Sequence, residues 1–201
     1  MHEPVAETVE ISGVDTLWTV PNLFTFVRLL CLPLFVWILF GLPSRQAAAW
    51  LLGGLGATDW IDGYLARRLG QTSEFGKIFD PTVDRLLFVV GIVSIVVNDS
   101  MPLWFGAAVL AREVLVGGSM VVATLAYGME RFDVTWWGKT ATFLLMFAVP
   151  GFLMGNSSVP ASGAWLVAAW IFGIPGLLLS YYTAIAYIPS IRAGIAAGRA
   201  R

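Results

Sequence analysis

Six long apolar stretches follow one another along the chain, and short polar segments separate them. They cover residues 21–42, 46–68, 74–98, 102–127, 135–155 and 162–189. Each is close to the ~20 residues that an apolar helix needs to cross a bilayer. Residues 1–19 are polar with scattered apolar positions, which predicts a short segment at the membrane interface. We therefore expect an all-α integral membrane protein, with an interfacial N-terminal segment at 1–19, six transmembrane helices in one membrane domain at 20–190 and a short basic tail at 191–201.

The composition agrees with this fold class. The 201 residues are 58% hydrophobic and only 12% charged, which is typical of a membrane protein and not of a soluble globule. The net charge of −1 argues against a nucleic acid as a partner. Composition alone thus indicates the lipid bilayer as the surroundings of the chain.

The lysine and arginine residues predict how the helices are oriented in the membrane. With six spans, one side carries only Arg45, and the other side carries a basic group: Arg67, Arg68, Lys77, Arg131, Lys139, Arg192, Arg199 and Arg201. Because positive charge collects on the cytoplasmic side, both termini and the loop between the second and third spans face the cytoplasm. We expect a multi-pass protein of the cell membrane whose functional groups open to the cytoplasm.

Four aspartates interrupt the second and third apolar stretches. Asp59 and Asp62 lie near the end of the second stretch, and Asp80 and Asp84 lie near the start of the third. Spacings of three and four residues place each pair on one face of a helix. The short polar segment between the two stretches predicts an antiparallel helix hairpin, which would bring the four carboxylates together.

Four carboxylates this close repel one another unless a cation neutralises them. Oxygen ligands without a nearby histidine or cysteine suit a hard divalent ion, Mg²⁺ or Mn²⁺. Four carboxylates fit two ions better than one, and two ions can hold both ends of a phosphoryl displacement. The alternative is that the aspartates merely meet water at helix ends, which suits one or two of them but not a set inside an apolar sequence.

The residues around the aspartates complete a longer pattern. It reads Asp59-x2-Asp62-Gly63-x2-Ala66-Arg67-x8-Gly76-x3-Asp80-x3-Asp84. This pattern resembles, position for position, the signature of the CDP-alcohol phosphatidyltransferases. The resemblance implies a six-helix membrane enzyme, usually a homodimer, that moves a phosphatidyl group from CDP-diacylglycerol to an alcohol acceptor and releases CMP.

By the same resemblance, the aspartates have different roles. Asp59, Asp62 and Asp80 would be ligands of two Mg²⁺ ions, with Mn²⁺ as a possible substitute, and Asp80 would touch both ions. Asp84 would be the general base that takes the proton of the attacking hydroxyl, and would also touch one metal.

The small and basic residues of the motif would serve the nucleotide. Gly63 and Gly76 would make room for the CDP moiety, with Ala66 aiding close packing. Arg67 would lie by the nucleotide or brace a carboxylate. The segment 19–28 is similar to the family's usual entry into its first helix, which implies that Asn22, Thr25 and Arg28 approach the nucleotide, although helix capping also explains Asn22.

Three arginines remain inside predicted spans: Arg28, Arg85 and Arg112. Intramembrane charges normally face the bundle interior and have a partner. A structural interpretation pairs Arg112 with Glu113, and Arg85 with its neighbour Asp84. A functional interpretation makes Arg85, Arg112 and Lys139 a basic pocket for an anionic acceptor.

Parts of the sequence indicate which alcohol would accept the phosphatidyl group. Residues 59–72, 79–81 and 111–116 look most like phosphatidylglycerophosphate synthases, but those enzymes usually have Lys at the position of Arg85, and often Arg-Glu at the positions of Met120-Val121. The expected order of acceptors is glycerol 3-phosphate, then phosphatidylglycerol as in cardiolipin synthases, then inositol phosphate. Two other classes are alternatives: a Mg²⁺-dependent membrane prenyltransferase and a non-catalytic cation transporter.

Overall fold

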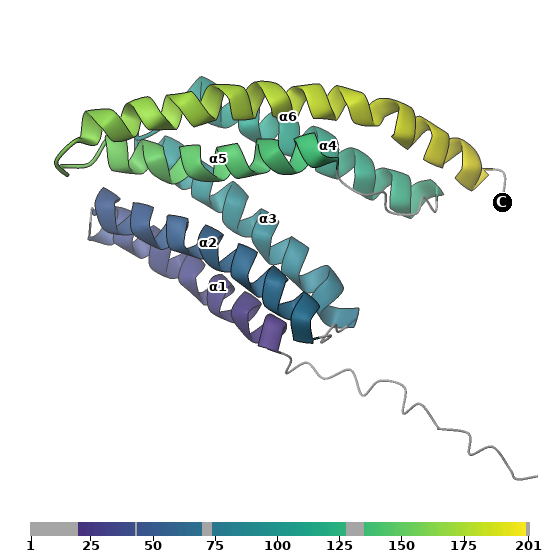
Figure 1. Ribbon diagram of the computed structural model, residues 1–201, viewed down its shortest axis with the longest axis horizontal. Helices are drawn as coiled ribbons and strands as arrows, with labels where there is room; N and C mark the ends of the chain where they lie inside the picture. Colours follow the sequence, from purple (N-terminus) through teal and green to yellow (C-terminus); the bar gives the residue numbers. More distant parts are fainter. Residues whose placement is uncertain (1–19, 43, 70–73, 128–134, 200–201) are drawn as a thin grey trace, which may run out of the picture.

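The computed structural model describes residues 20–42, 44–69, 74–127 and 135–199, and the side chains of these except at 20–21, 59–69, 74–78, 81, 120–127, 190–191 and 193–199. In these ranges the regular structure is entirely helical (Figure 1). The elements are α1 (Val20–Val36), a π-helical turn η1 (Trp37–Gly41), α2 (Arg45–Leu69), α3 (Glu74–Val97), α4 (Leu103–Tyr127), α5 (Trp136–Gly155) and α6 (Ser162–Arg199). The predicted all-α fold is confirmed. The predicted N-terminal segment at 1–19 lies outside the described residues.

Five of the six predicted helices end within two residues of the expected positions, if η1 is counted with α1. The exception is α6, which continues ten residues past the predicted end at 189. Pro189 lacks one backbone donor, but an alanine-rich sequence follows it and favours the helix. Most of the predicted basic tail is therefore the last part of α6.

Within the described ranges, three helical segments are long and apolar enough by themselves to cross a membrane. These are Asn22–Gly41, Trp136–Gly155 and Ser162–Pro189. Many large apolar side chains on them are exposed, among them Leu30, Phe147 and Leu178, as expected of surfaces that face lipid. The expectation that α2, α3 and α4 also span the bilayer stays a prediction.

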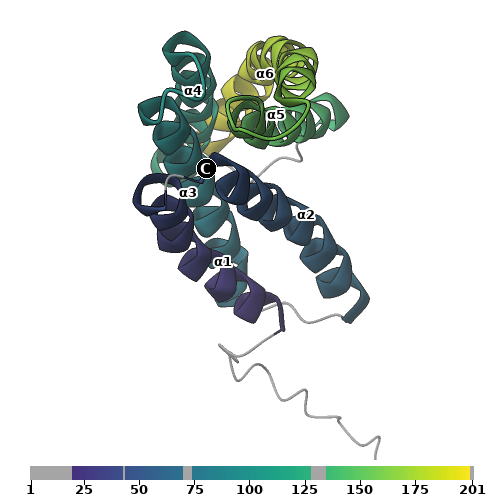
Figure 2. The ribbon, with the colours of Figure 1, turned by 90° about the vertical axis from the view of Figure 1, so that its left-hand side faces the viewer.

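The helices form two groups that approach each other at one end of the molecule and separate toward the other (Figures 1 and 2). The antiparallel pair α5 and α6 forms one group with α4, and α1, α2 and α3 form the second. We call the approaching end, where α2 begins and α3 and α5 end, the loop end. The opposite end, where α2 ends and α1 and α3 begin, is the carboxylate end.

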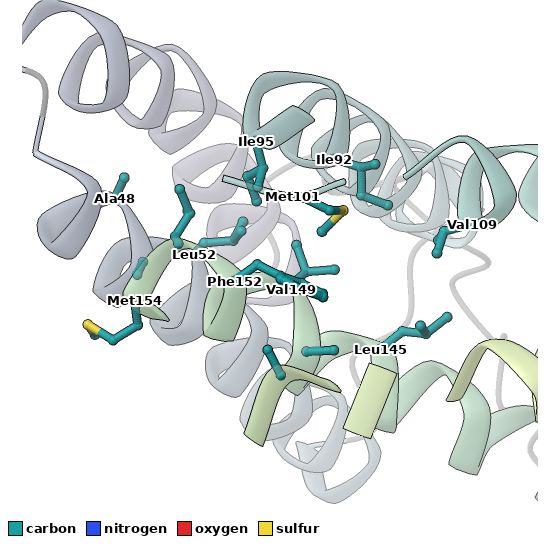
Figure 3. Close-up of a cluster of buried hydrophobic side chains, with 14 of the residues drawn as sticks. Ala48, Leu52, Ile92, Ile95, Met101, Val109, Leu145, Val149, Phe152 and Met154 are labelled. Atoms are coloured by element: carbon teal, nitrogen blue, oxygen red, sulfur yellow. The ribbon is translucent and has the colours of Figure 1, made fainter. Parts of the chain in front are cut away.

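The main core lies between the two groups. Figure 3 shows Leu52 of α2, Ile92 and Ile95 of α3, Val109 of α4 and Val149 of α5 directed toward one another. All are buried. This shared core holds the two groups together and leaves the carboxylate end of each group to diverge.

Aromatic rings and glycines fix α4, α5 and α6. Phe105 of α4, Phe152 of α5 and Trp170 of α6 have ring centroids 5.0–5.6 Å apart. At Gly155 an added Cβ would lie 2.8 Å from the backbone of Leu166, so α5 and α6 touch there almost backbone to backbone. Small residues permit such close approach between membrane helices.

Candidate functional site

The two halves of the aspartate motif lie at the same end of the molecule. Asp59 and Asp62 are on the last turns of α2, and Asp80 and Asp84 are in the first half of α3. Both segments reach the carboxylate end in Figure 1, as the predicted helix hairpin requires. The side chains of Asp59, Asp62, Gly63, Ala66, Arg67 and Gly76 lie outside the described residues, so their contacts stay predictions.

Asp80 is fixed by a hydrogen bond from the first helix. The hydroxyl Oγ1 of Thr25 donates to Oδ1 of Asp80. Thr25 is buried, and Asp80 is partly buried. The bond joins α1 to α3, and it orients a carboxylate that the sequence alone could only place on a helix face.

Asp84 is fixed in the same way, by an ion pair. A guanidinium nitrogen of Arg28 donates to Oδ1 of Asp84. The side chain of Arg28 is 5% exposed and that of Asp84 is 40% exposed. An arginine buried among apolar helices needs a charged partner, and Asp84 provides it while keeping one side toward solvent.

A buried polar stripe on α1 makes both contacts. Asn22, Thr25 and Arg28 are three residues apart, and they are buried to 1%, 3% and 4% exposure. Three-residue steps place them on one face of the helix. The sequence assigned these residues to the nucleotide by resemblance; the structure additionally makes two of them partners of the α3 carboxylates. The polar spacing within an apolar helix was the signal that this face is buried against other helices, but it does not identify the partner residues.

A second charged cluster lies one residue further along α3. Arg85 Nε is 3.4 Å from Glu113 Oε1, and an Arg112 guanidinium nitrogen is 3.0 Å from Glu113 Oε2. Arg112 Nε also donates to the carbonyl of Ser180 on α6, at 3.5 Å. The pairing of Arg112 with Glu113 matches the structural interpretation of the sequence. Arg85 forms an ion pair with Glu113, whereas the structural interpretation of the sequence paired it with its neighbour Asp84.

The two clusters border one cavity of about 320 Å³. Arg28 and Asp84 line it beside Arg85, Arg112 and Glu113. The rest of the described lining is mainly apolar, with Thr142 of α5 and Tyr187 of α6 as polar members. Its large apolar residues come from α2, α3, α4 and α5: Leu52, Leu55, Leu87, Phe88, Val109, Val116, Leu145, Met146, Val149 and Pro150. The functional interpretation of Arg85 and Arg112 is therefore compatible with their ion pairs, because both also face this space.

Lys139 is placed differently. It lies in the first turn of α5, its side chain is exposed, and it is not among the described residues that line the cavity. Its predicted part in an acceptor pocket with Arg85 and Arg112 therefore has no support from the geometry of this chain.

A larger cavity, about 690 Å³, lies at the loop end. It is lined by polar groups of Arg45, Asn98, Asn156 and neighbouring serines. These groups are hydrogen-bonded to one another: Arg45 reaches Asn98 Oδ1 at 2.7 Å, and the carbonyls of Asn98 and Asn156 at 2.9 Å each. Size alone would select this cavity, but Asp84 of the carboxylate motif borders the smaller one.

Comparison with known proteins agrees with the motif. The sequence model of the CDP-alcohol phosphatidyltransferase family matches residues 18–175. A cardiolipin synthase (CMP-forming) of Streptomyces coelicolor is 34% identical over 183 residues, covering 89% of this chain and 85% of the relative. A CDP-diacylglycerol–glycerol-3-phosphate 3-phosphatidyltransferase of Pseudomonas fluorescens is 33% identical over 181 residues, covering 84% of this chain and 88% of the relative. The match contains all eight motif positions and both contacts from α1, and the chain belongs to the CDP-alcohol phosphatidyltransferase family.

Proposed function

We propose that this protein transfers a phosphatidyl group from CDP-diacylglycerol to the hydroxyl of an alcohol and releases CMP. One observation carries the proposal beyond family membership. The carboxylates of Asp80 and Asp84, four residues apart on α3, are each held by a buried side chain of α1, and Asp84 borders a cavity. Carboxylates oriented in this way favour catalysis, because their positions are fixed before any ligand binds.

The donor set fits the metal that the family implies. Asp59, Asp62, Asp80 and Asp84 offer only oxygen, which suits Mg²⁺, with Mn²⁺ as a substitute. The hydrogen bond from Thr25 uses Oδ1 of Asp80, which leaves Oδ2 compatible with a cation. Two bound ions would neutralise the diphosphate and the charge that develops on the departing CMP.

The protein residues handle the proton and the geometry. The bond that forms joins the acceptor oxygen to the phosphorus of the phosphatidyl group, and the bond that breaks joins this phosphorus to the bridging oxygen that leaves with CMP. Asp84 takes the hydroxyl proton, and Arg28 holds the carboxylate in place for that transfer.

The nucleotide would occupy the carboxylate end. Gly63, Ala66 and Gly76 give it close approach to the backbone of α2 and α3, and Arg67 carries charge that a phosphate or a motif carboxylate can use. Asn22 lies on the same buried face of α1 as Thr25 and Arg28, and it is our candidate for a contact to the cytidine.

Two acceptors have support from relatives. The names of the two relatives above refer to glycerol 3-phosphate in one case and to cardiolipin formation in the other, and their identities to this chain differ by one percentage point. We keep glycerol 3-phosphate and phosphatidylglycerol as the candidates, with inositol phosphate third. Family membership argues against the prenyltransferase and the cation transporter.

The cellular setting is also a proposal. We expect a homodimer in the cell membrane, with both termini and the carboxylate end facing the cytoplasm. The N-terminus of α1 and the C-terminus of α6 do lie toward the same end of the bundle as the carboxylates in Figure 1. This arrangement supports a cytoplasmic site, since the basic residues of the sequence predict that same side.

The test uses purified protein in detergent with Mg²⁺ and radiolabelled CDP-diacylglycerol. Glycerol 3-phosphate, phosphatidylglycerol and inositol phosphate are supplied in separate reactions, and lipid products and CMP are quantified. We expect acceptor-dependent CMP release with a matching labelled lipid. No phosphatidyl transfer to any of the three acceptors would contradict the proposed function.

A further inference from the structure

The cavity beside Asp84 is lined by two chemically different kinds of side chain. Five of the described lining residues are charged: Arg28, Asp84, Arg85, Arg112 and Glu113. The other described lining residues are mainly aliphatic, with Phe88, Met146 and Pro150, and include the hydroxyl groups of Thr142 and Tyr187. A site built for a small, highly charged metabolite would be expected to have polar groups around it, whereas this one combines a charged region with an apolar wall.

The cluster of Arg85, Arg112 and Glu113 has a net charge that a ligand with one negative charge would balance. Arg85 and Arg112 share the single carboxylate of Glu113, so the three side chains together carry one positive charge. Arg28 and Asp84 neutralise each other. Excess positive charge in a partly buried site is stabilised by an anionic ligand. A phosphodiester brings one negative charge, whereas the phosphate of glycerol 3-phosphate brings nearly two.

Gly117 gives one of the arginines its position. A Cβ at this residue of α4 would lie 3.1–3.2 Å from the guanidinium atoms of Arg85. Arg85 therefore lies against the backbone of α4, within reach of Glu113 one helical turn earlier. A methyl group at position 117 would require the guanidinium group to shift by a few tenths of an ångström.

The apolar wall extends away from the reacting carboxylate. Gly91 lines the cavity seven residues after Asp84, which is about 10 Å along α3. Its missing Cβ would lie 3.7 Å from Leu52 of α2, an ordinary contact distance. The cavity volume of about 320 Å³ is within the range of small-molecule sites, about 300–1,000 Å³.

We propose that this cavity holds the acceptor, and that the acceptor is a glycerophospholipid with a free headgroup hydroxyl. Its phosphodiester lies on Arg85 and Arg112, its hydroxyl reaches Asp84, and the first part of an acyl chain lies on the wall near Gly91. This inference rests on the proposed function and selects phosphatidylglycerol over glycerol 3-phosphate. It reverses the order of acceptors that the sequence alone favoured.

The experiment compares glycine variants that fill the cavity with a matched control. Gly91→Val adds bulk at the apolar wall, and Gly117→Ala shifts the guanidinium group of Arg85. Gly118→Val and Gly118→Ala make the same changes at an exposed position of α4 where an added Cβ meets nothing within 4 Å. Each protein is assayed with phosphatidylglycerol and with glycerol 3-phosphate, and its binding of phosphatidylglycerol without CDP-diacylglycerol is measured by native mass spectrometry.

We expect the unaltered protein to prefer phosphatidylglycerol over glycerol 3-phosphate by at least tenfold in kcat/KM. Gly91→Val is expected to lower kcat/KM for phosphatidylglycerol about tenfold, and Gly117→Ala to raise KM a few fold. Both should weaken phosphatidylglycerol binding while the Gly118 variants bind normally. Protection of each variant against heat by CDP and Mg²⁺ serves as the check that the nucleotide site is intact.

Transfer to glycerol 3-phosphate with phosphatidylglycerol inert would overturn the inference and leave the proposed function standing. Equal effects of the Gly91 and Gly118 substitutions would also overturn it, because the cavity would then not hold the acceptor. Transfer to neither acceptor would overturn both the inference and the proposed function.

Discussion

The two ends of the helix bundle both have an arginine at the centre of a polar cluster, but they use it in different ways. At the loop end, all three nitrogens of the Arg45 guanidinium donate to Asn98 or Asn156. Two of the acceptors are carbonyls just after the ends of α3 and α5, where helix carbonyls lack partners within the helix. Asn156 in turn donates to the carbonyl of Ser100 at 2.9 Å. This cluster joins three helix ends.

At the carboxylate end, the charged groups surround a space. Arg28 and Thr25 each hold one carboxylate of α3, and two further arginines share Glu113 at the edge of the same cavity. The loop-end cavity is about twice as large, 690 Å³ against 320 Å³, yet its polar groups bond to one another. Charge that remains directed at a cavity, and not cavity size, therefore distinguishes the proposed functional end from the loop end.

The largest expected effect is on activity, from Asp84→Asn. The amide keeps the size of the side chain but cannot accept the hydroxyl proton, so CMP release should fall about 10²–10⁴-fold. The matched control is Asp99→Asn at the loop end. Asp99 is exposed and has φ of 57°, a conformation that asparagine also tolerates, so this variant should keep its activity. Equal activity of the two variants would contradict the difference between the ends.

A smaller loss of activity is expected from Arg28→Gln. Glutamine can still donate a hydrogen bond to Asp84 but does not fix it with charge, so we expect kcat to fall about tenfold to a hundredfold. Arg28→Lys keeps the charge and should recover part of that loss. An unchanged kcat in Arg28→Gln, measured as CMP release at saturating substrates, would show that the ion pair has no positioning role.

A substitution at the loop end should lower the stability of the protein and leave the rate of CMP release unchanged. Arg45→Gln removes hydrogen bonds to three acceptors, and we expect the free energy of unfolding to fall by about 3 kcal/mol, since each bond from a charged donor contributes about 1.5–3 kcal/mol and such bonds are not additive. Activity below the unfolding temperature should be unchanged. Arg192→Gln, on an exposed part of α6, is the control for loss of charge. Thermal unfolding in detergent and CMP release, measured on the same preparations, make this comparison.

The smallest effect concerns helix packing. Gly155→Ala forces a Cβ to within 2.8 Å of the backbone of Leu166, so α5 and α6 must move apart, at a cost of about 1–3 kcal/mol. Gly163→Ala, near the start of α6, meets nothing within 4 Å and should be neutral or stabilising by up to about 1 kcal/mol. The melting temperatures of the two variants test this prediction. A Gly155→Ala protein as stable as the unaltered one would mean that the close approach of α5 and α6 is not required.

The sequence predicts the helices well, because apolar length and polar interruptions determine where a membrane helix begins and ends. Arg112 and Glu113 are adjacent, and their ion pair was also predictable. The partners of Thr25 and Arg28 are 55 and 56 residues away, and that of Arg85 is 28 residues away. Such pairs depend on how α1, α3 and α4 pack, which no local pattern reports.

The end of α6 shows a second feature that the sequence pattern did not predict, although it is local. An apolar span is expected to end near Pro189, where the membrane surface is predicted, but a helix can continue beyond the span that crosses the membrane. The structure continues α6 to Arg199 for this reason. Hydropathy locates the part of a helix that lipid can cover, and not the whole helix.

We propose that the carboxylate end binds a divalent cation and CDP together. The most direct measurement is the thermal unfolding of the purified protein with Mg²⁺, with CDP, with both and with neither. We predict that CDP raises the melting temperature only when Mg²⁺ is present, that Asp80→Asn removes this rise, and that Arg45→Gln keeps it on a lower baseline. A rise with CDP that is independent of Mg²⁺, or one that survives in Asp80→Asn, would show that the motif carboxylates do not bind the cation and CDP together.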